Sequence, residues 1–382
     1  MHNIIGRLLI CLLFSLSMQA KDAKTIHADS LQLFLNTTIS EHQIPGIAVA
    51  FFQSDTILNI ATAGVRKLGA DPLLKKEDKL HLGSCSKAIT GHLAGIVVES
   101  GKIRWDSRVV DVFPELETEI NSRYKNVTLQ QLLNHTARVQ PFTEDVEWEL
   151  LERFTENDPV KRRYNFAKWV LQMDTVVMDS AALKQGYVYS NAGYAVATSM
   201  LEKATGKSWS SMLEKEIFQP LGIDGLIGWP AQAEPSQPWG HWTGEADSSK
   251  TLRPHPPEHF NIDPILAPSG DVSLSLQDYV VYIQKHLSGL NGNDKQFPAT
   301  FYEHLHYSSM ETTSYSVGWG ATKRFNDTLS THTGSAGTFH CYIILFKKMD
   351  IAVAIISNSA DEGAEKAVRP IRNYFLQSYL KK

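Results

Sequence analysis

A serine and a lysine three residues apart could carry out nucleophilic chemistry in this chain. They lie in the segment Gly83-Ser84-Cys85-Ser86-Lys87. If a helix begins there, residues i and i+3 share one face, so the hydroxyl and the amine lie side by side. The N-terminus of a helix also carries free N–H groups and partial positive charge. We therefore predict that a neutral Lys87 deprotonates Ser84, and that the amide of Ser84 helps to hold an oxyanion.

The same Ser-x-x-Lys spacing occurs at two other places, Ser122–Lys125 and Ser378–Lys381. Neither is surrounded by the small residues that suit the start of a helix, and the second lies at the end of the sequence. A solvated serine and lysine is therefore the plain alternative for any single copy of this spacing. Ser84 stands out because two further polar groups follow it along the chain.

Tyr189 and Asn191 form the second polar group, within the segment Gly186–Tyr194. On a loop, a Tyr-x-Asn presents a phenol and an amide on one side. A lysine ammonium nearby would lower the pKa of the phenol, which predicts a phenolate base, and the amide could hold a substrate carbonyl. The alternative is a half-buried core tyrosine, since Tyr124–Asn126 has the same spacing.

The third polar group is His332-Thr333-Gly334-Ser335, in a predicted strand. Gly334 would let a substrate backbone approach the edge of that strand. The amide of Ser335 is the predicted second oxyanion donor. His332 and Thr333 could meet a substrate carboxylate. The alternative is an ordinary entry into a turn.

A competing signal is His255-Pro256-Pro257-Glu258-His259, which has the H-x-x-E-H spacing of one type of metallopeptidase. That mechanism needs a helix to bring both histidines onto one face. The two prolines lie inside the would-be turn and remove helix N–H donors. We therefore predict no metal site here and no cofactor.

The N-terminus and the composition limit the class of protein. Arg7, an apolar run over 8–16 and Ala20 before Lys21 predict a secretory signal peptide over residues 1–20, and hence a secreted or periplasmic protein. An uncleaved anchor is the alternative, although the run is too short to span a bilayer. With a formal net charge of −4 and no basic stripe, no nucleic-acid partner is expected.

Two cysteines follow this segment, Cys85 and Cys341. An exported protein could pair them. A cross-link at Cys85 would lie between the two site residues, so we predict two buried free thiols.

Hydrophobic periodicity predicts the elements that must position these groups. Helices are predicted over residues 29–42, 87–99, 192–204, 275–287 and 362–380, with a short helix over 127–136 capped by Thr128. Strands are predicted over 47–53, 57–63, 330–335, 339–346 and 351–357, with a turn at 347–350. Residues 229–257 are predicted to be loop. In the first helix, Leu31, Leu33, Phe34 and Ile39 are the expected core contacts.

This order of elements predicts an α+β fold. An antiparallel sheet would assemble from residues 47–63 and 330–357, flanked by helices from both ends of the chain, with an inserted all-helical lobe. We predict a sheet lobe formed by residues 21–79 and 226–382 and a helical lobe formed by residues 80–225.

Ser-x-x-Lys, Tyr-x-Asn and His-Thr-Gly occur here in the order found in class C β-lactamase-like and penicillin-binding serine hydrolases, and the chain resembles that family. The similarity extends over nearly the whole chain after residue 20. It includes Leu132–Thr136, Tyr189–Tyr194, Ala267–Gly270 with Asp278, Gly318–Gly320 and Ile355–Asn358. The resemblance implies a β-lactamase/transpeptidase-like fold with the active site in the cleft between the two lobes.

The resemblance also implies catalytic roles. Ser84 would be the acylated nucleophile, and Lys87 and Tyr189 would shuttle its proton. The backbone amides of Ser84 and Ser335 would form the oxyanion hole. No metal takes part in this chemistry.

By the same resemblance, Asn191 would orient the substrate, and His332, Thr333 and Gly334 would line the third wall of the cleft. True class C β-lactamases have a lysine where this chain has His332. A histidine there resembles D-alanyl-D-alanine carboxypeptidases, D-aminopeptidases and related esterases. A second departure lies near Arg138, where relatives usually have a glycine.

The implied function is that of a secreted serine hydrolase, acting through an acyl-enzyme on a D-amino-acid peptide, an ester or a β-lactam. The alternative is a non-catalytic, penicillin-binding-like sensor of cell-wall peptides, because fold alone does not fix function. Retention of all the catalytic residues favours the enzyme. The partner is then a small-molecule or peptide substrate, and an association with the cell envelope is left open.

Overall fold

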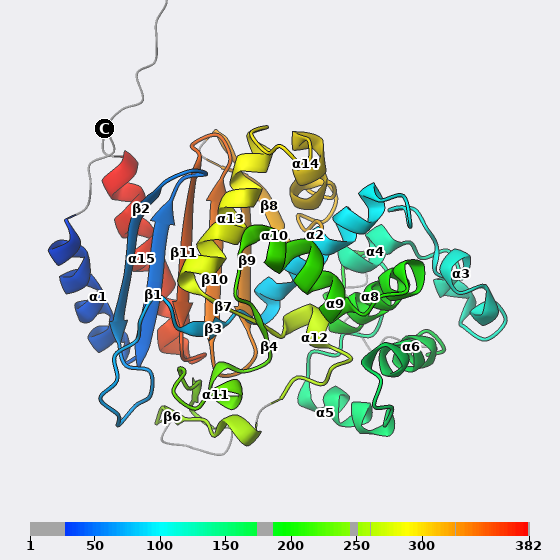
Figure 1. Ribbon diagram of the computed structural model, residues 1–382, viewed down its shortest axis with the longest axis horizontal. Helices are drawn as coiled ribbons and strands as arrows, with labels where there is room; N and C mark the ends of the chain where they lie inside the picture. The colour runs from blue at the N-terminus through cyan, green and yellow to red at the C-terminus, as the bar shows by residue number, and fades with distance from the viewer. Residues whose placement is uncertain (1–26, 174–185, 245–250, 260, 325, 381–382) are drawn as a thin grey trace, which may run out of the picture.

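A six-stranded antiparallel sheet organises the fold (Figure 1). The computed structural model describes residues 27–173, 186–244, 251–259, 261–324 and 326–380, so the predicted signal peptide lies outside the described residues. The strand order is β2–β1–β11–β10–β9–β8. The strands are β1 Gly46–Phe52, β2 Ile57–Gly64, β8 Gly320–Arg324, β9 Asp327–Ser335, β10 His340–Phe346 and β11 Ile351–Ser357.

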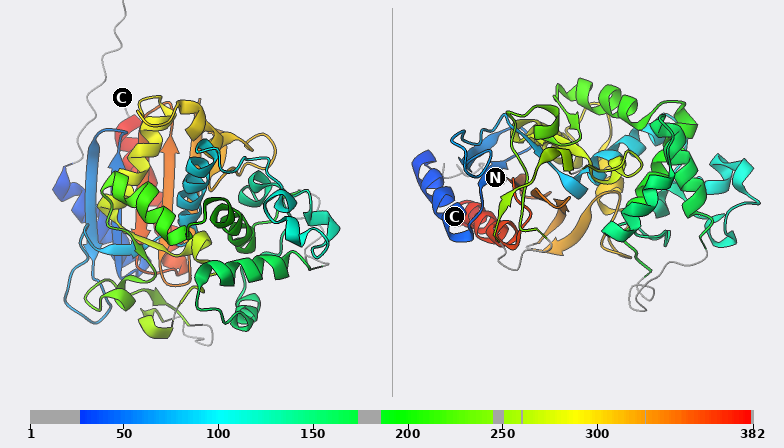
Figure 2. Two further views of the ribbon diagram at one scale, coloured as in Figure 1. Left: turned by 45° about the vertical axis from the view of Figure 1, so that its right-hand side comes forward. Right: turned by 90° about the horizontal axis from the view of Figure 1, so that it is seen from below.

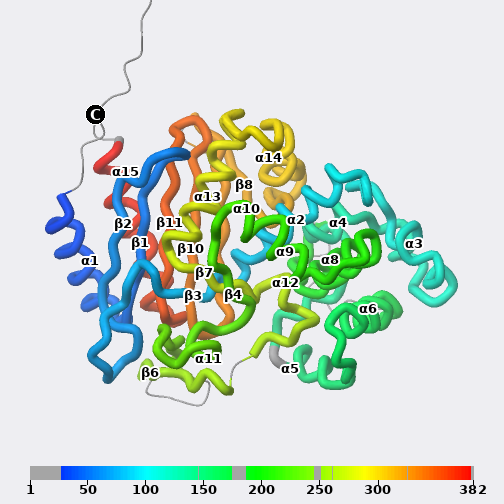
Figure 3. Tube along the Cα trace, viewed as in Figure 1, coloured from blue at the N-terminus to red at the C-terminus, as the bar shows by residue number. Residues whose placement is uncertain are grey.

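Both faces of this sheet are apolar and covered. Phe51 and Phe52 are neighbours on β1, and because side chains alternate along a strand they enter two different hydrophobic clusters. The face with Phe51 packs on α1 (Ala28–His42) and α15 (Glu362–Leu380), which lie side by side (Figure 3). Phe375 of α15 stacks on Phe51 with ring centroids 5.2 Å apart. The opposite face carries the rest of the molecule.

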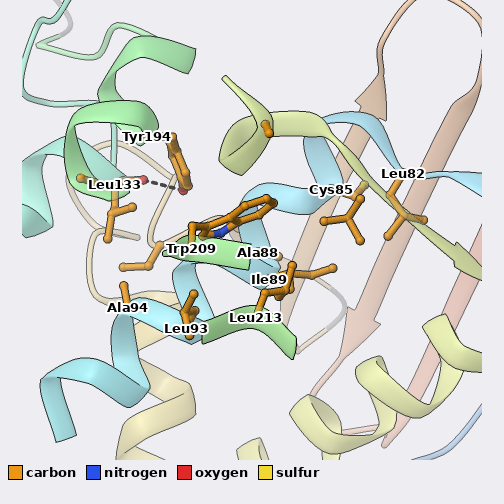
Figure 4. Packing of buried hydrophobic residues seen from close by; sticks show 14 of the residues in the cluster. Leu82, Cys85, Ala88, Ile89, Leu93, Ala94, Leu133, Tyr194, Trp209 and Leu213 are labelled. Atoms are coloured by element: carbon orange, nitrogen blue, oxygen red, sulfur yellow. Dashed lines mark hydrogen bonds between the residues drawn. The ribbon is translucent and has the colours of Figure 1, made fainter. Parts of the chain in front are cut away.

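The helices of the middle of the chain gather around α2 (Ser86–Glu99). Figure 4 shows Ile89 and Leu93 of α2 beside Trp209 and Leu213, all within one buried cluster. Helix α2 is buried on nearly all sides over its first three turns, and the buried residues include the polar side chains of Ser86, Lys87, Thr90 and His92 besides the apolar ones. The other helices of this part are α3 Val109–Val112, α4 Leu129–Leu133, α5 Asp145–Trp148, α6 Pro159–Val170, α8 Asn191–Thr205, α9 Trp209–Leu213 and α10 Gln219–Leu221.

Short elements join these helices to the sheet. The strands β3 (Lys79–His81), β7 (Val272–Ser275) and β4 (Leu226–Ile227) form a three-stranded sheet. The chain leaves β3 directly for the turn that holds Ser84, and the amide of Leu82 donates to the carbonyl of Val272 at 2.9 Å. The remaining elements are β5 His241–Trp242, β6 Arg253–Pro254, α11 Pro230–Ala233, α12 Ala267–Gly270, α13 Leu276–Leu290 and α14 Ala299–Tyr307.

Viewed from below, the sheet with α1 and α15 lies at one end of the molecule and the helices of the middle of the chain lie at the other (Figure 2). The α+β class and the β-lactamase/transpeptidase-like arrangement are those predicted. The division at residues 79 and 225 stays a prediction. Among the described helices, none combines the length and the apolar character that crossing a membrane requires.

The main predicted elements are confirmed, and their errors have physical causes. The five predicted strands all enter the large sheet, and Thr128 caps α4 by accepting from the amide of Gln131 at 3.2 Å. The prediction for Leu33 was wrong, because this side chain is 68% exposed. The buried stripe of α1 follows Leu31 and Leu35, and Leu33 lies on the opposite side of the helix.

Candidate active site

Ser84 lies in a single 3₁₀ turn, η1 (Gly83–Cys85), that runs directly into α2. Ser84 and Lys87 are thus one turn apart, and Ser84 Oγ lies 3.2 Å from Lys87 Nζ. Gly83 has φ of 52°, a region that glycine enters without strain. A Cβ on Gly83 would also lie 2.5 Å from the backbone nitrogen of Ser335. The turn therefore presses Ser84 against the end of β9.

Lys87 is fully buried and has three polar neighbours. Its Nζ lies 2.7 Å from Asn191 Oδ1 and 2.8 Å from the carbonyl oxygen of Ser269, besides Ser84 Oγ. Burial lowers the pKa of Lys87 well below its usual value, so the neutral amine is favoured. A neutral amine has two N–H bonds and one lone pair. With Asn191 and Ser269 accepting the two N–H bonds, the lone pair is left for the Ser84 hydroxyl.

The local fold fixes the orientation of Asn191. Ser190 caps α8, with its Oγ accepting from the amide of Gly193 at 2.8 Å, so Asn191 is the first residue of that helix. Asn191 Nδ2 donates to the carbonyl of Phe142 at 2.8 Å. Because Nδ2 is engaged there, the amide oxygen faces Lys87. Asn191 therefore holds the amine that activates Ser84, besides any contact with substrate.

Tyr189 is brought to the nucleophile, but not as a phenolate. Lys87 Nζ lies 4.6 Å from the centroid of the Tyr189 ring. Burial raises the pKa of Tyr189, and a hydrogen bond with Ser84 only partly opposes the shift. The prediction of a lowered phenol pKa was wrong for the resting site, because Lys87 supplies no positive charge when it is neutral. Tyr189 therefore begins the reaction with its proton in place.

The two predicted oxyanion donors are adjacent. A Cβ on Gly334 would lie 2.0 Å from the carbonyl oxygen of Leu82 and 2.9 Å from the amide nitrogen of Ser84. Only a glycine lets β9 approach η1 this closely. The amides of Ser84 and Ser335 thus lie at the junction of the two elements, where a developing oxyanion can meet both.

His332 is buried and has partners on both ring nitrogens. Its Nδ1 lies 2.8 Å from the carbonyl oxygen of Thr333, which can only accept, so Nδ1 carries the hydrogen. Its Nε2 lies 2.9 Å from the hydroxyl of Tyr315, so both ring nitrogens are engaged. Thr333 is exposed and lies on the opposite face of β9 from His332.

Sequence reasoning missed several residues of the site. The carbonyl of Ser269 binds Lys87, Tyr315 binds His332, and His135 packs on Tyr189 with ring centroids 4.4 Å apart. Ser269 and His135 lie inside segments that carry the family resemblance, so a signal for them existed. Tyr315 carries no such signal.

A histidine–aspartate pair supports the turn from behind. His81 Nε2 lies 3.1 Å from Asp271 Oδ1, and His81 Nδ1 accepts from the amide of Gly83 at 3.2 Å. The His81 ring stacks on Trp229 with centroids 4.0 Å apart. The pair thereby holds the residue that precedes Ser84.

A cavity of about 360 Å³ opens next to Ser84. Asn191 and Ser335 line it near the nucleophile. Farther out, Trp148 gives it an apolar wall, and Arg162 and Asp263 form an ion pair in its lining. This volume is at the lower end of what small-molecule pockets offer.

The fold and the site together are those of the β-lactamase and penicillin-binding class of proteins. The chain belongs to the β-lactamase family, because the model of the family described as "Beta-lactamase" matches residues 22–375. The chain is 28% identical to penicillin-binding protein 4 of Amycolatopsis lactamdurans over 65% of its own length and 61% of that protein. It is 22% identical to a β-lactamase of Escherichia coli K12 over 70% of its length and 63% of that protein. The alignments thus span less than two thirds of these two relatives.

Solved structures show the same fold at low sequence identity. The octameric penicillin-binding protein homologue of Pyrococcus abyssi superposes with a TM-score of 0.71 and 18% identity, covering 92% of this chain and 78% of that one. The class C β-lactamase of Rhodobacter sphaeroides superposes with a TM-score of 0.67 and 19% identity, covering 89% of this chain and 97% of that one. At such identities the likeness concerns the fold alone.

Proposed function

We propose that this protein is a serine hydrolase that acts through an acyl-enzyme on an amide or ester substrate. The observation that carries the proposal is the 3.2 Å approach of Ser84 Oγ to a buried Lys87 amine whose pKa is lowered. A lysine in this state is a base, and a serine beside such a base is an activated nucleophile.

The reaction follows from the positions of these groups. Ser84 Oγ attacks the substrate carbonyl while its proton passes to the lone pair of Lys87 Nζ. The amides of Ser84 and Ser335 bind the oxyanion of the tetrahedral intermediate. Tyr189 gives its phenolic proton to the leaving group and regains one from Lys87, so the bond to the leaving group breaks and the acyl-enzyme remains. A water molecule then attacks the ester by the reverse use of the same groups.

His332, on the third wall of the cleft, favours substrates whose binding needs no permanently charged side chain there. Both ring nitrogens of His332 are engaged, by Tyr315 and by a backbone carbonyl, so the ring is not poised to grip a carboxylate. We therefore place esters without a carboxylate ahead of D-amino-acid peptides with a free C-terminal carboxylate and ahead of β-lactams as substrates. Matched acid and ester substrates should keep the same ratio of kcat/KM between pH 6 and 8. A selective loss of the acid as pH rises, cured by His332→Lys, would show that His332 acts as a cation instead.

We also propose that the protein works outside the cytoplasm, after cleavage of the chain behind Ala20. The basic and apolar start of the sequence supports this location. Its substrates would then be envelope peptides or small esters. Mass determination of the exported protein decides it, since a chain that begins at residue 21 is expected.

The test of the chemistry is intact-mass measurement after treatment with a fluorophosphonate or a labelled penicillin. One adduct is expected on the wild type, mapping to Ser84, and none on Ser84→Ala. Ser122→Ala is the matched control, because this exposed serine has the same Ser-x-x-Lys spacing and should leave labelling unchanged.

Turnover of p-nitrophenyl esters, nitrocefin and D-Ala-D-Ala peptides then separates the activities. Labelling without turnover of any of these would favour the sensor of cell-wall peptides. An adduct that persists in Ser84→Ala, or that maps to Cys85, would contradict the proposed nucleophile.

A further inference from the structure

His135 accepts hydrogen bonds from the backbone amides of both residues that flank Tyr189. The amide of Val188 donates to the backbone carbonyl of His135 at 2.8 Å. The amide of Ser190 donates to His135 Nδ1 at 3.1 Å. The imidazole ring also packs on the phenol ring of Tyr189, with centroids 4.4 Å apart and an interplanar angle of 43°. One residue therefore fixes the backbone before Tyr189, the backbone after it and one face of its ring.

The imidazole is in the protonation state that this contact requires. Because the Ser190 amide can only donate, Nδ1 must accept, and the single hydrogen of a neutral ring lies on Nε2. Burial lowers the pKa of His135 well below its usual value. Burial therefore favours the neutral form that the hydrogen bond from Ser190 requires.

Three features of His135 are unfavourable for the fold by themselves. The residue has φ of 63°, in the left-handed region that side chains rarely adopt. It is 1% exposed, so its polar ring is desolvated. Its Nε2 finds no hydrogen-bond partner among the described residues, and the ring lies among the rings of Tyr194 and Tyr315, with centroids 5.4 and 4.7 Å away. Strained backbone and unsatisfied buried groups gather where a site demands one particular geometry.

We propose that His135 is a positioning residue for Tyr189, which holds the phenol in reach of Ser84 and of the leaving group. This inference rests on the proposed function, because it gives His135 a part in the same acyl transfer. His135 touches no reacting atom. Its effect passes through the peptide groups of Val188 and Ser190, and a displacement of about 1 Å in such a geometry can lower a rate by about 10²-fold.

The test compares two substitutions of similar size. His135→Asn places a side-chain oxygen near the position of Nδ1 and tolerates the left-handed backbone, whereas His135→Leu removes the acceptor. We expect His135→Leu to lower kcat by about 10²-fold with little change in KM. His135→Asn should restore most of the rate. His259→Asn, at an exposed histidine, is the control for the substitution itself and should behave as wild type.

A double substitution separates positioning from a general role in stability. In Tyr189→Phe the phenol is already absent, so adding His135→Leu should lower kcat much less than it does in the wild type. An equal loss in both backgrounds would overturn the proposal, as would wild-type kcat in His135→Leu. If His135→Leu does not fold, His135→Gln replaces it, because the amide of glutamine reaches past the Nδ1 position. If the wild type is not acylated at all, the proposed function fails and this inference fails with it.

Discussion

The hydrogen bonds that Lys87 Nζ makes determine where the lone pair of the neutral amine points. Two acceptors, Asn191 Oδ1 and the carbonyl of Ser269, take both N–H bonds of the neutral amine. The lone pair then points at Ser84. Protonation would turn Nζ into a donor toward Ser84 Oγ and remove the base. Since the pKa of Lys87 is lowered, the base is present above that pKa and is lost as the pH falls through it.

Lys87→Met tests this assignment, because methionine keeps a long unbranched side chain but has no amine. We expect the rate of acylation to fall by about 10²–10⁴-fold, the usual weight of general base catalysis. Rapid-quench mass spectrometry with the probe measures it. Lys125→Met, in the other Ser-x-x-Lys segment, should acylate as the wild type does. In the wild type the rate should decline toward acid pH and should not decline between pH 7 and 9.

Tyr189→Phe should leave the fold and KM nearly unchanged but lower turnover by about 10²–10⁴-fold. The reason is the missing phenolic proton, since a phenol with a raised pKa is a proton donor in the resting site. Steady-state kinetics on an ester and on an amide measure the effect. Turnover of the amide should fall more than turnover of the ester, because the amine leaving group depends more strongly on receiving a proton. Tyr342→Phe, on the other face of the sheet, is the control, and equal turnover in Tyr189→Phe and wild type would remove Tyr189 from the mechanism.

Residue spacing predicted the part of the site whose residues lie close together in the sequence. Ser84 and Lys87 are one turn apart, so the sequence alone places them together. The contact of Lys87 with Asn191 depends on where α8 begins and was not predicted, since the family resemblance implied only that Asn191 orients the substrate. Tyr315 and His135 lie far apart in the chain and meet through tertiary packing at 4.7 Å between ring centroids. The pKa of Tyr189 was predicted with the wrong sign, because the sequence does not show that the phenol itself is buried.

At the scale of elements, the approach of β9 to η1 brings the two predicted oxyanion donors together. Strand β8 pairs with β9 only from Asp327 to Thr331, so the rest of β9 is an open edge. That edge meets the turn of Ser84 through Gly334. Strand β9, which we predict to bind the substrate backbone, and η1, which carries the proposed nucleophile Ser84, thus share one contact.

Gly334→Ala should separate these two elements. Its Cβ would lie 2.0 Å from the Leu82 carbonyl oxygen, which is backbone and cannot turn away, so β9 or η1 must move. We expect acylation to fall by about 10²-fold or more, as when an oxyanion donor is lost. Gly292→Ala is the control: it has φ of 75° but open space around it, so it costs backbone strain only. Wild-type acylation in Gly334→Ala would show that the contact is not needed.

Elements with a strong hydrophobic pattern were predicted from the sequence, and elements without one were missed. Strands β1, β10 and β11 are rich in β-branched and aromatic residues and were predicted within one or two residues. Strand β8, Gly320–Arg324, is largely exposed and lacks such a pattern, so it was missed. Strands β3 and β4 are three and two residues long, too short for any periodicity.

At the scale of the whole molecule, a chain of three buried histidines joins its parts. His92 of α2, His286 of α13 and His306 of α14 form hydrogen bonds of 3.2 and 2.9 Å between ring nitrogens. His306 Nδ1 continues the chain to Ser330 Oγ of β9 at 2.7 Å. Burial lowers the pKa of His92 to about 3, and it lowers the pKa values of His286 and His306 well below the usual range.

The three buried histidines predict that the folded protein is less stable at acid pH. The three histidines bind protons in the unfolded state below about pH 6.5 but resist them in the folded state, so their contribution to stability is full above pH 6.5 and is lost as the pH falls toward their folded pKa values. Each should remove up to ~1.4 kcal/mol per pH unit from the free energy of unfolding. Urea denaturation at pH 7.5, 6.5 and 5.5 measures the slope. His286→Gln should reduce the slope, exposed His259→Gln should not, and equal stability at pH 7.5 and 5.5 would contradict the prediction.

Cys85 and Cys341 are free and buried, as predicted. Cys85 lies on η1 and Cys341 on β10, and Cys85 Sγ is 3.9 Å from the Cys341 carbonyl oxygen. Because Cys85 is 1% exposed, a thiol reagent reaches it only when the structure around η1 opens. In a chain without Cys11 and Cys341, the alkylation rate therefore reports how often the structure around the turn of Ser84 opens in the native protein. The alkylation rate of Cys85 thus measures local opening around the active site without any substrate.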